Sequence, residues 1–181
     1  IVFFGFTSTG AGRDLSTLTI GATNQVTTVL QTPFDERESV VSPDGHWLAY
    51  ESNSSGRYEV YVRPFPNVDG GERRISTAGG TRALWAPNGK ELFYVGADSR
   101  LMQVTVVATG TAWSSRTPTR LFERPYYVGT NSGRSYDVSA DGQRFLMIKP
   151  GQGSEETEAR PSLVVVQNWF DELTRLVPVA K

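Results

Sequence analysis

The sequence predicts an all-β protein built from repeated units of about four short antiparallel strands. Two observations lead to this fold class. A four-residue turn containing Asp-Gly or Asn-Gly recurs along the chain, each time followed by an aromatic and aliphatic run. Between these turns lie short segments that alternate polar and apolar residues with a period of two, as half-buried strands do.

The repeated turn is the strongest local signal. It reads Ser-Pro-Asp-Gly at 42–45, Ala-Pro-Asn-Gly at 86–89 and Ser-Ala-Asp-Gly at 139–142. Asp-Gly and Asn-Gly tolerate the positive φ that a tight connection between two strands requires. Each turn therefore predicts a hairpin.

Further strands follow each hairpin in the same order. The hairpin strands are expected at 39–41 and 46–50, at 83–85 and 90–94, and at 136–138 and 143–147. Third strands are expected at 57–62, 101–106 and 162–166, and shorter fourth strands at 73–76 and 120–122. The first unit has runs at 1–7, 15–20 and 26–30, but its own turn would lie before residue 1, so we expect it to be incomplete.

The turns at Asp44, Asn88 and Asp141 are spaced 44 and 53 residues apart, and an insertion around 109–119 explains the longer interval. Four strands in about 44 residues match a β-propeller blade. We therefore expect one partial propeller over 1–181, with blades at roughly 1–36, 37–80, 81–130 and 131–170. The alternatives are a β-sandwich, whose strands need not repeat in fixed register, and a closed four-bladed ring.

A short helix is expected at the C-terminal end, over 169–176. Trp169, Phe170, Leu173 and Leu176 recur there at helical spacing and would form one apolar face. The simplest role for that face is packing on the rim of the propeller rather than binding a free partner.

Composition excludes several classes of function. The net charge is −1, which argues against a general affinity for nucleic acid or for anionic membranes. There is no cysteine, so disulfides, cysteine metal ligands and a cysteine nucleophile are excluded. No apolar run is long enough to insert this chain into a membrane. We expect no cofactor and no metal, because the usual zinc ligands and the Asp-x-Asp-x-Asp calcium loop are missing.

Catalytic motifs are also missing. The single histidine, His46, follows the first turn at a position where the other repeats carry Lys90 and Gln143, so it reads as an exposed strand start. The Gly-x-Ser-x-Gly elbow of hydrolases does not occur. The segment 5–10 has one residue too many between its first glycine and the serine, and we interpret it as a glycine-rich loop. We therefore expect that the chain is not an enzyme. If it is one, we expect a hydrolase with a non-standard site.

Several segments resemble a known family. They are 31–37 (QTPFDER), 59–66 (EVYVRPFP), 89–94 (GKELFY), 136–139 (YDVS) and the pair Asn168-Trp169. Together with the Ser-Pro-Asp-Gly turn, they are similar to the TolB-like, WD-related propeller repeat, as in the C-terminal propellers of bacterial sensor proteins linked to serine/threonine kinases. The resemblance implies a longer parent protein and a periplasmic or otherwise extracytoplasmic location. The kinase motifs themselves are absent from this sequence.

The candidate binding residues come from position in the repeat. The innermost strand of each propeller blade lines the central channel. Aligning the turns places five side chains at the channel mouth: Arg37, Glu38, Arg82, Arg134 and Tyr136. Arginines gathered there could hold an anionic ligand or a peptide carboxylate. Alternatively, they pair with Asp35, Glu36 and Asp137 around the ring.

We therefore expect a non-enzymatic binding module that recognises a peptide, a protein or a small anionic ligand. The alternatives are the hydrolase, either a lone propeller esterase or the propeller of a peptidase, and a purely structural fragment that self-assembles. An incomplete propeller leaves blade faces and sheet edges uncovered. Homodimerisation through these open blade ends is expected for that reason.

Overall fold

The computed structural model describes residues 1–6, 12–109, 112–122 and 133–148. These residues belong to one compact unit, 1–150, and a second unit, 151–181, lies outside the described residues. The expected strand at 162–166 and the expected helix over 169–176 fall in that second unit and are therefore not described.

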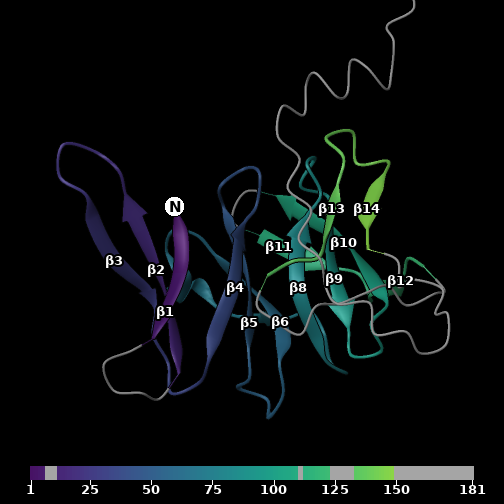
Figure 1. The fold of residues 1–181 in the computed structure, drawn as a ribbon, viewed down its shortest axis with the longest axis horizontal. Helices are drawn as coiled ribbons and strands as arrows, with labels where there is room; N and C mark the ends of the chain where they lie inside the picture. The colour runs from purple at the N-terminus through teal and green to yellow at the C-terminus, as the bar shows by residue number, and fades with distance from the viewer. Residues whose placement is uncertain (7–11, 110–111, 123–132, 149–181) are drawn as a thin grey trace, which may run out of the picture. The chain divides into compact units, whose positions relative to one another are not determined.

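The described strands form four antiparallel sheets that follow one another along the chain (Figure 1). The first sheet holds β1 (Val2–Phe6), β2 (Arg13–Thr19) and β3 (Gln25–Leu30). The second holds β4 (Glu36–Val41), β5 (Trp47–Ser52), β6 (Glu59–Pro64) and β7 (Arg73–Arg74), with a 3-10 helix, η1 (Val68–Gly70), before β7. The third holds β8 (Gly80–Trp85), β9 (Glu91–Gly96), β10 (Leu101–Thr109), β11 (Ala112–Ser115) and β12 (Thr119–Arg120). The fourth holds β13 (Tyr136–Val138) and β14 (Phe145–Met147).

The three predicted turns connect the first two strands of the second, third and fourth sheets. In each turn the glycine has a positive φ, and the preceding Asp or Asn accepts a hydrogen bond from the backbone N–H two residues further on. The glycine φ values are 76° at Gly45, 70° at Gly89 and 71° at Gly142. The acceptors are Asp44, Asn88 and Asp141. The turn residues therefore adopt the conformation for which their sequence is suited.

The second and third sheets each contribute to two apolar cores, as strand alternation shows on β5 of the second sheet. Trp47 and Ala49 point into an apolar core shared with the third sheet. The alternate residues Leu48 and Tyr50 point to the opposite face, into another core shared with the first sheet. Successive side chains of a strand point to opposite faces, so one strand contributes to two cores.

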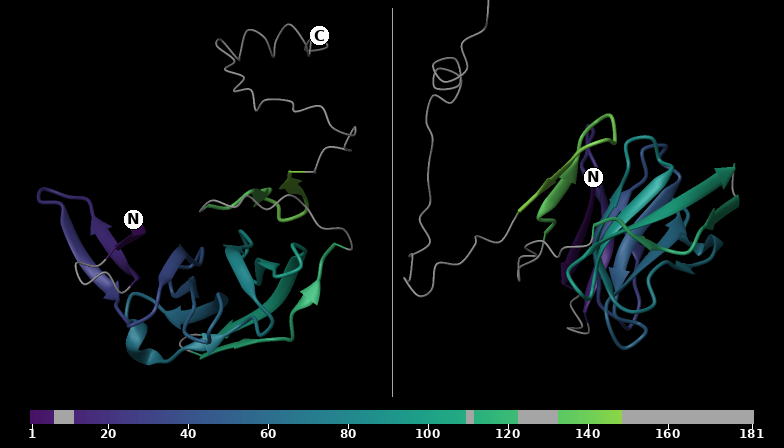
Figure 2. Two further views of the ribbon diagram at one scale, coloured as in Figure 1. Left: turned by 60° about the horizontal axis from the view of Figure 1, so that its bottom comes forward. Right: turned by 90° about the vertical axis from the view of Figure 1, so that its right-hand side faces the viewer.

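A third core joins the third and fourth sheets in the same way. The Phe145 ring meets the Phe93 ring edge-on, with centroids 4.9 Å apart, and Tyr136 is buried beside them. Consecutive sheets thus pack face to face through apolar cores (Figure 2). Antiparallel sheets of short strands that pack in this sequential way are propeller-type blades, and the predicted fold class is confirmed.

The insertion between the second and third turns has a defined structure. It lengthens β10 to nine residues and adds β11, which pairs with the end of β10. Trp113 of β11 is buried, and its ring centroid lies 6.0 Å from that of Trp47. The extra residues therefore extend the third sheet and cover the core between the second and third sheets.

Candidate functional site

The candidate site lies on the first strands of the second, third and fourth sheets, which are β4, β8 and β13. In β4, Arg37 pairs with Glu51 and Val40 with Ala49, so two residues of β4 stand opposite one residue of β5. The same bulge recurs in β8 between Thr81 and Leu84. β-bulges redirect side chains and often lie next to functional sites.

The bulges place Glu38 and Arg82 in an uncommon backbone conformation. Their φ values are 48° and 58°, in the left-handed region that non-glycine residues seldom adopt. The two residues also occupy equivalent positions of the repeat. Such a conformation persists only where surrounding contacts hold it, and it is frequent at binding and switch sites.

A buried carboxylate holds the two bulges together. Glu51 of β5 is 1% exposed. Its Oε2 binds the Nε of Arg37 at 2.8 Å, and its Oε1 accepts a hydrogen bond from the backbone N–H of Arg82 at 2.5 Å. Burial raises the pKa of Glu51, while the Arg82 N–H and the Arg37 guanidinium favour the ionised form.

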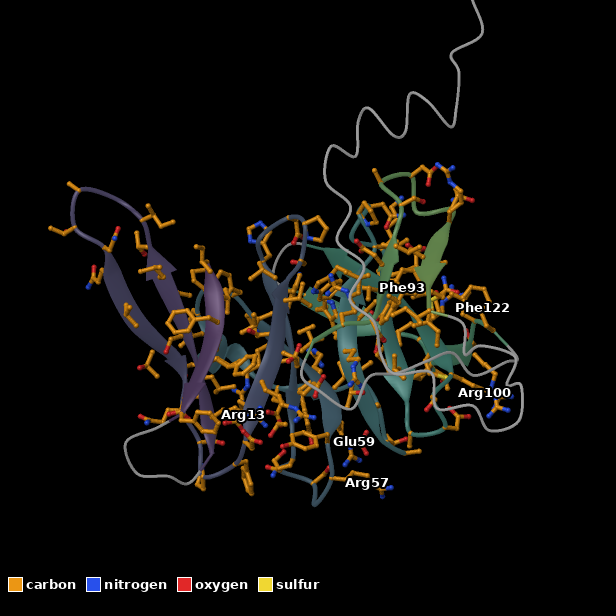
Figure 3. The ribbon with its side chains drawn as sticks, viewed as in Figure 1. Arg13, Arg57, Glu59, Phe93, Arg100 and Phe122 are labelled. Carbon is orange, nitrogen blue, oxygen red and sulfur yellow. The ribbon has the colours of Figure 1, made fainter. Side chains whose placement is uncertain are left out.

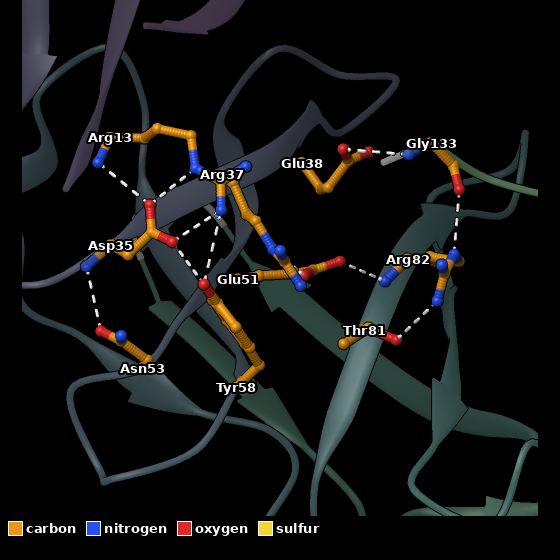
Figure 4. A network of polar contacts seen from close by, with 10 residues as sticks. All are labelled: Arg13, Asp35, Arg37, Glu38, Glu51, Asn53, Tyr58, Thr81, Arg82 and Gly133. Carbon is orange, nitrogen blue, oxygen red and sulfur yellow. Dashed lines mark hydrogen bonds and ion pairs between the residues drawn. The ribbon is translucent and has the colours of Figure 1, made fainter. Parts of the chain in front are cut away.

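One backbone residue that precedes β13, Gly133, is held from two sides (Figure 4). The Oε1 of Glu38 accepts a hydrogen bond from the N–H of Gly133 at 3.1 Å, and the Nε of Arg82 donates to the carbonyl of Gly133 at 2.9 Å. The Tyr136 hydroxyl donates to the carbonyl of Arg82 at 2.6 Å. We call Glu38 and Arg82 the peptide clamp, since together they bind the N–H and the C=O of one residue.

The structure therefore brings the five predicted site residues into one network. Glu38 and Arg82 both bind Gly133, Tyr136 binds the carbonyl of Arg82, and Arg37 joins them through Glu51. Arg134 is exposed and donates from Nε to the Tyr136 carbonyl at 3.0 Å. That these residues bind a ligand stays a prediction.

The ion pairs differ from those considered in the sequence. Arg37 pairs with Glu51 and stacks on the Tyr58 ring, with 3.6 Å between its Cζ and the ring centroid. Asp35 instead pairs with Arg13, from the first sheet, at 2.6 Å and accepts a hydrogen bond from Tyr58. The hydrogen bonds from Arg13 lower the pKa of Asp35. These pairs tie the first sheet to the second.

Sequence reasoning missed Glu51, Tyr58 and Gly133. Glu51 did carry a signal, because it ends a run of residues that is otherwise apolar or aromatic, where a charge needs a partner. Tyr58 and Gly133 carried none, since their roles depend on which loops meet in space.

Two more buried carboxylates lie between the first and second sheets. Asp14 and Glu36 are both buried, and each has one oxygen, Oδ1 and Oε2 respectively, without a hydrogen-bond partner in the described structure. Burial raises the pKa of Glu36, although Thr32 and Ser52 both donate hydrogen bonds to its Oε1.

Glu36 is expected to make stability depend on pH. An acid whose pKa is raised by folding binds more protons in the folded than in the unfolded state, so the free energy of unfolding falls as pH rises above the ordinary value of 4.5. Glu36→Gln should therefore weaken the loss of stability between about pH 5 and about pH 8 in urea denaturation. Glu91→Gln is the control, and an unchanged pH dependence in Glu36→Gln would contradict this assignment.

The catalytic candidates gain no support from the described residues. His46 is exposed at the end of its turn, as expected. Within the described ranges, no group of three or more histidine, cysteine or acidic residues is placed to hold a metal ion. None of the described helices is long and apolar enough to cross a membrane.

The sheets and their first-strand network define a protein of the β-propeller type. No family model and no curated protein matches the sequence. Among solved structures, the chain is similar to TolB from Acinetobacter baumannii, with 12% identity and a TM-score of 0.44 over 84% of this chain and 47% of that chain. The chain thus spans about half the length of that TolB chain.

Proposed function

We propose that the chain is a non-enzymatic β-propeller binding module that takes a peptide, a protein segment or a small anionic ligand on its first strands. The observation that carries this proposal is the peptide clamp. Glu38 and Arg82 lie at equivalent bulges of neighbouring repeats and bind the N–H and the C=O of Gly133. The same pair of groups fits the main chain of an incoming peptide.

The charges around the clamp favour an anionic group. The network contains three guanidinium groups, those of Arg37, Arg82 and Arg134, and two carboxylates, those of Glu38 and Glu51. Guanidinium groups bind carboxylates through directed, often bidentate hydrogen bonds. Arg134 is exposed, so it is accessible to the terminal carboxylate of a peptide whose main chain displaces Gly133.

Affinity selection tests this proposal. Short random-sequence peptides are selected on the immobilised chain, and the selected peptides are measured by calorimetry with free and amidated C-termini. We expect Arg82→Gln combined with Arg134→Gln to weaken binding roughly tenfold or more, because charge-assisted hydrogen bonds are lost. Amidation should weaken binding to the wild-type chain.

The matched control combines Arg57→Gln with Arg144→Gln, at two exposed arginines that contact none of the five site residues in the described structure (Figure 3 labels Arg57). Equal affinity of the site variant and the control would overturn the proposed site. Turnover of ester or peptide substrates that is lost in His46→Ala would overturn the non-enzymatic assignment. The link to kinase-associated sensors and the extracytoplasmic location stay predictions from resemblance.

A further inference from the structure

Two acidic side chains are buried at the junction of the first and second sheets. Asp14 of β2 is 7% exposed, and Glu36 of β4 is 1% exposed. The Nε2 of Gln31 donates to Asp14 Oδ2 at 2.8 Å. The next residue, Thr32, donates from Oγ1 to Glu36 Oε1 at 2.7 Å. Burial and, less strongly, the negative charges of Asp14 and Asp35 raise the pKa of Glu36, so these acids lie close together.

Positive charge is short at this junction. Arg13 binds Asp35 through both Nε and Nη2, at 2.7 and 2.6 Å, and its Nη2 also donates to Tyr58 (Figure 4). Its guanidinium is therefore taken up by the third acid. Within the described part of the chain, Asp14 and Glu36 take part in no ion pair. Asp14 Oδ1 and Glu36 Oε2 are both buried and accept no hydrogen bond, an unfavourable state for a carboxylate.

The equivalent junction between the second and third sheets holds a fully bonded acid. Glu59 of β6 stands where Asp14 stands in β2, directly before the first core residue of the strand. The N–H of Gly79 donates to both oxygens of Glu59 at 3.0 Å, and the hydroxyl of Ser76 donates to one of them. β8 begins with a glycine where β4 begins with a glutamate, so no second acid is present there. The first junction thus has one acid more and fewer donors.

We propose that the junction of the first and second sheets binds Ca²⁺ through Asp14 Oδ1 and Glu36 Oε2. A divalent cation balances the charge of two carboxylates, and a set of oxygen donors without nitrogen or sulfur suits Ca²⁺ rather than a transition metal. Ca²⁺ tolerates irregular geometry and takes further ligands from neutral oxygens. The amide of Gln31 and the hydroxyls of Thr32 and Ser52 lie next to the two carboxylates.

The site does not depend on the proposed ligand site. Its two acids lie on different strands, so no calcium-loop motif marks them in the sequence. The pH dependence expected for Glu36→Gln is that of the chain without Ca²⁺.

Urea denaturation of the full chain with and without CaCl2 tests the proposal, at about pH 8 to favour ionised carboxylates. About 5 mM CaCl2, above the range of weak calcium sites, should raise the wild-type midpoint relative to a chelator, because a ligand of the folded state stabilises it. NaCl of equal ionic strength should not reproduce this shift. Asp14→Asn and Glu36→Gln each remove one charged ligand at nearly unchanged size, and each should abolish it.

Glu59→Gln is the matched control, since it changes the equivalent acid of the next junction, and it should keep the calcium shift. Glu91→Gln, at a half-buried acid of the third sheet, is a second control with the same expectation. Calorimetric titration of CaCl2 should show one site in the wild-type chain and at least tenfold weaker binding in Asp14→Asn and in Glu36→Gln. No calcium shift in the wild-type chain, an equal shift with NaCl, or a shift that survives in either site variant would overturn the proposal.

Discussion

Replacing Trp113 by alanine is expected to lower the free energy of unfolding by about 3 kcal/mol, in the range for removing a buried aromatic side chain. Trp113 is 3% exposed and packs beside Trp47 in the core between the second and third sheets. The expected effect follows from the cavity that the change leaves in a core shared by two sheets. Urea denaturation followed by circular dichroism measures it.

Trp113→Phe is the matched control. The indole N–H of Trp113 has no hydrogen-bond partner in the described structure, so phenylalanine removes no hydrogen bond and keeps most of the ring. We expect a clearly smaller loss of stability for this change. Equal stability of the wild-type chain and Trp113→Ala would show that the β10–β11 extension does not contribute to the core.

Replacing Glu51 by alanine is the second change with a large expected effect, again about 3 kcal/mol of unfolding free energy. The change leaves the Arg82 N–H without its acceptor and Arg37 without its ion-pair partner. Because both bulges lose support, peptide binding should weaken together with stability. Denaturation midpoints and calorimetry with a selected peptide measure the two effects on the same variant.

Asp98→Asn is a suitable control for that experiment. Asp98 pairs with Arg100 and Arg120, but its side chain is 44% exposed, and exposed ion pairs contribute little to stability. The account is contradicted if Glu51→Ala is no less stable than this control, since Glu51 would then not hold the bulges.

The fold was predictable from the sequence because its signals are local. The turns at Asp44, Asn88 and Asp141 depend on residues within each turn, and the two-residue period of the segment 57–62, which contains most of β6, is visible without tertiary contacts. The spacing of the turns also located the insertion. Its structure, a hairpin extension that buries Trp113, depends on packing against another sheet and was not predictable.

The candidate site was predictable only in part. Repeat alignment identified Arg37, Glu38 and Arg82 because equivalent positions fall on equivalent strands. The bulges could not be predicted from the sequence, because glutamate and arginine do not favour a positive φ. Contacts with Glu51 and Gly133 hold Glu38 and Arg82 in that conformation. The ion-pair partners were mispredicted because neighbours in the sequence, such as Asp35, compete with acids brought in from other strands.

The measurement that tests the central claim most directly is calorimetry of a selected peptide against the wild-type chain and the variant carrying Arg82→Gln and Arg134→Gln. A binding module whose ligand lies on the first strands predicts measurable affinity for the wild-type chain and a loss of roughly tenfold or more in the variant. Equal affinity of both proteins would contradict the account, because the ligand would then bind elsewhere.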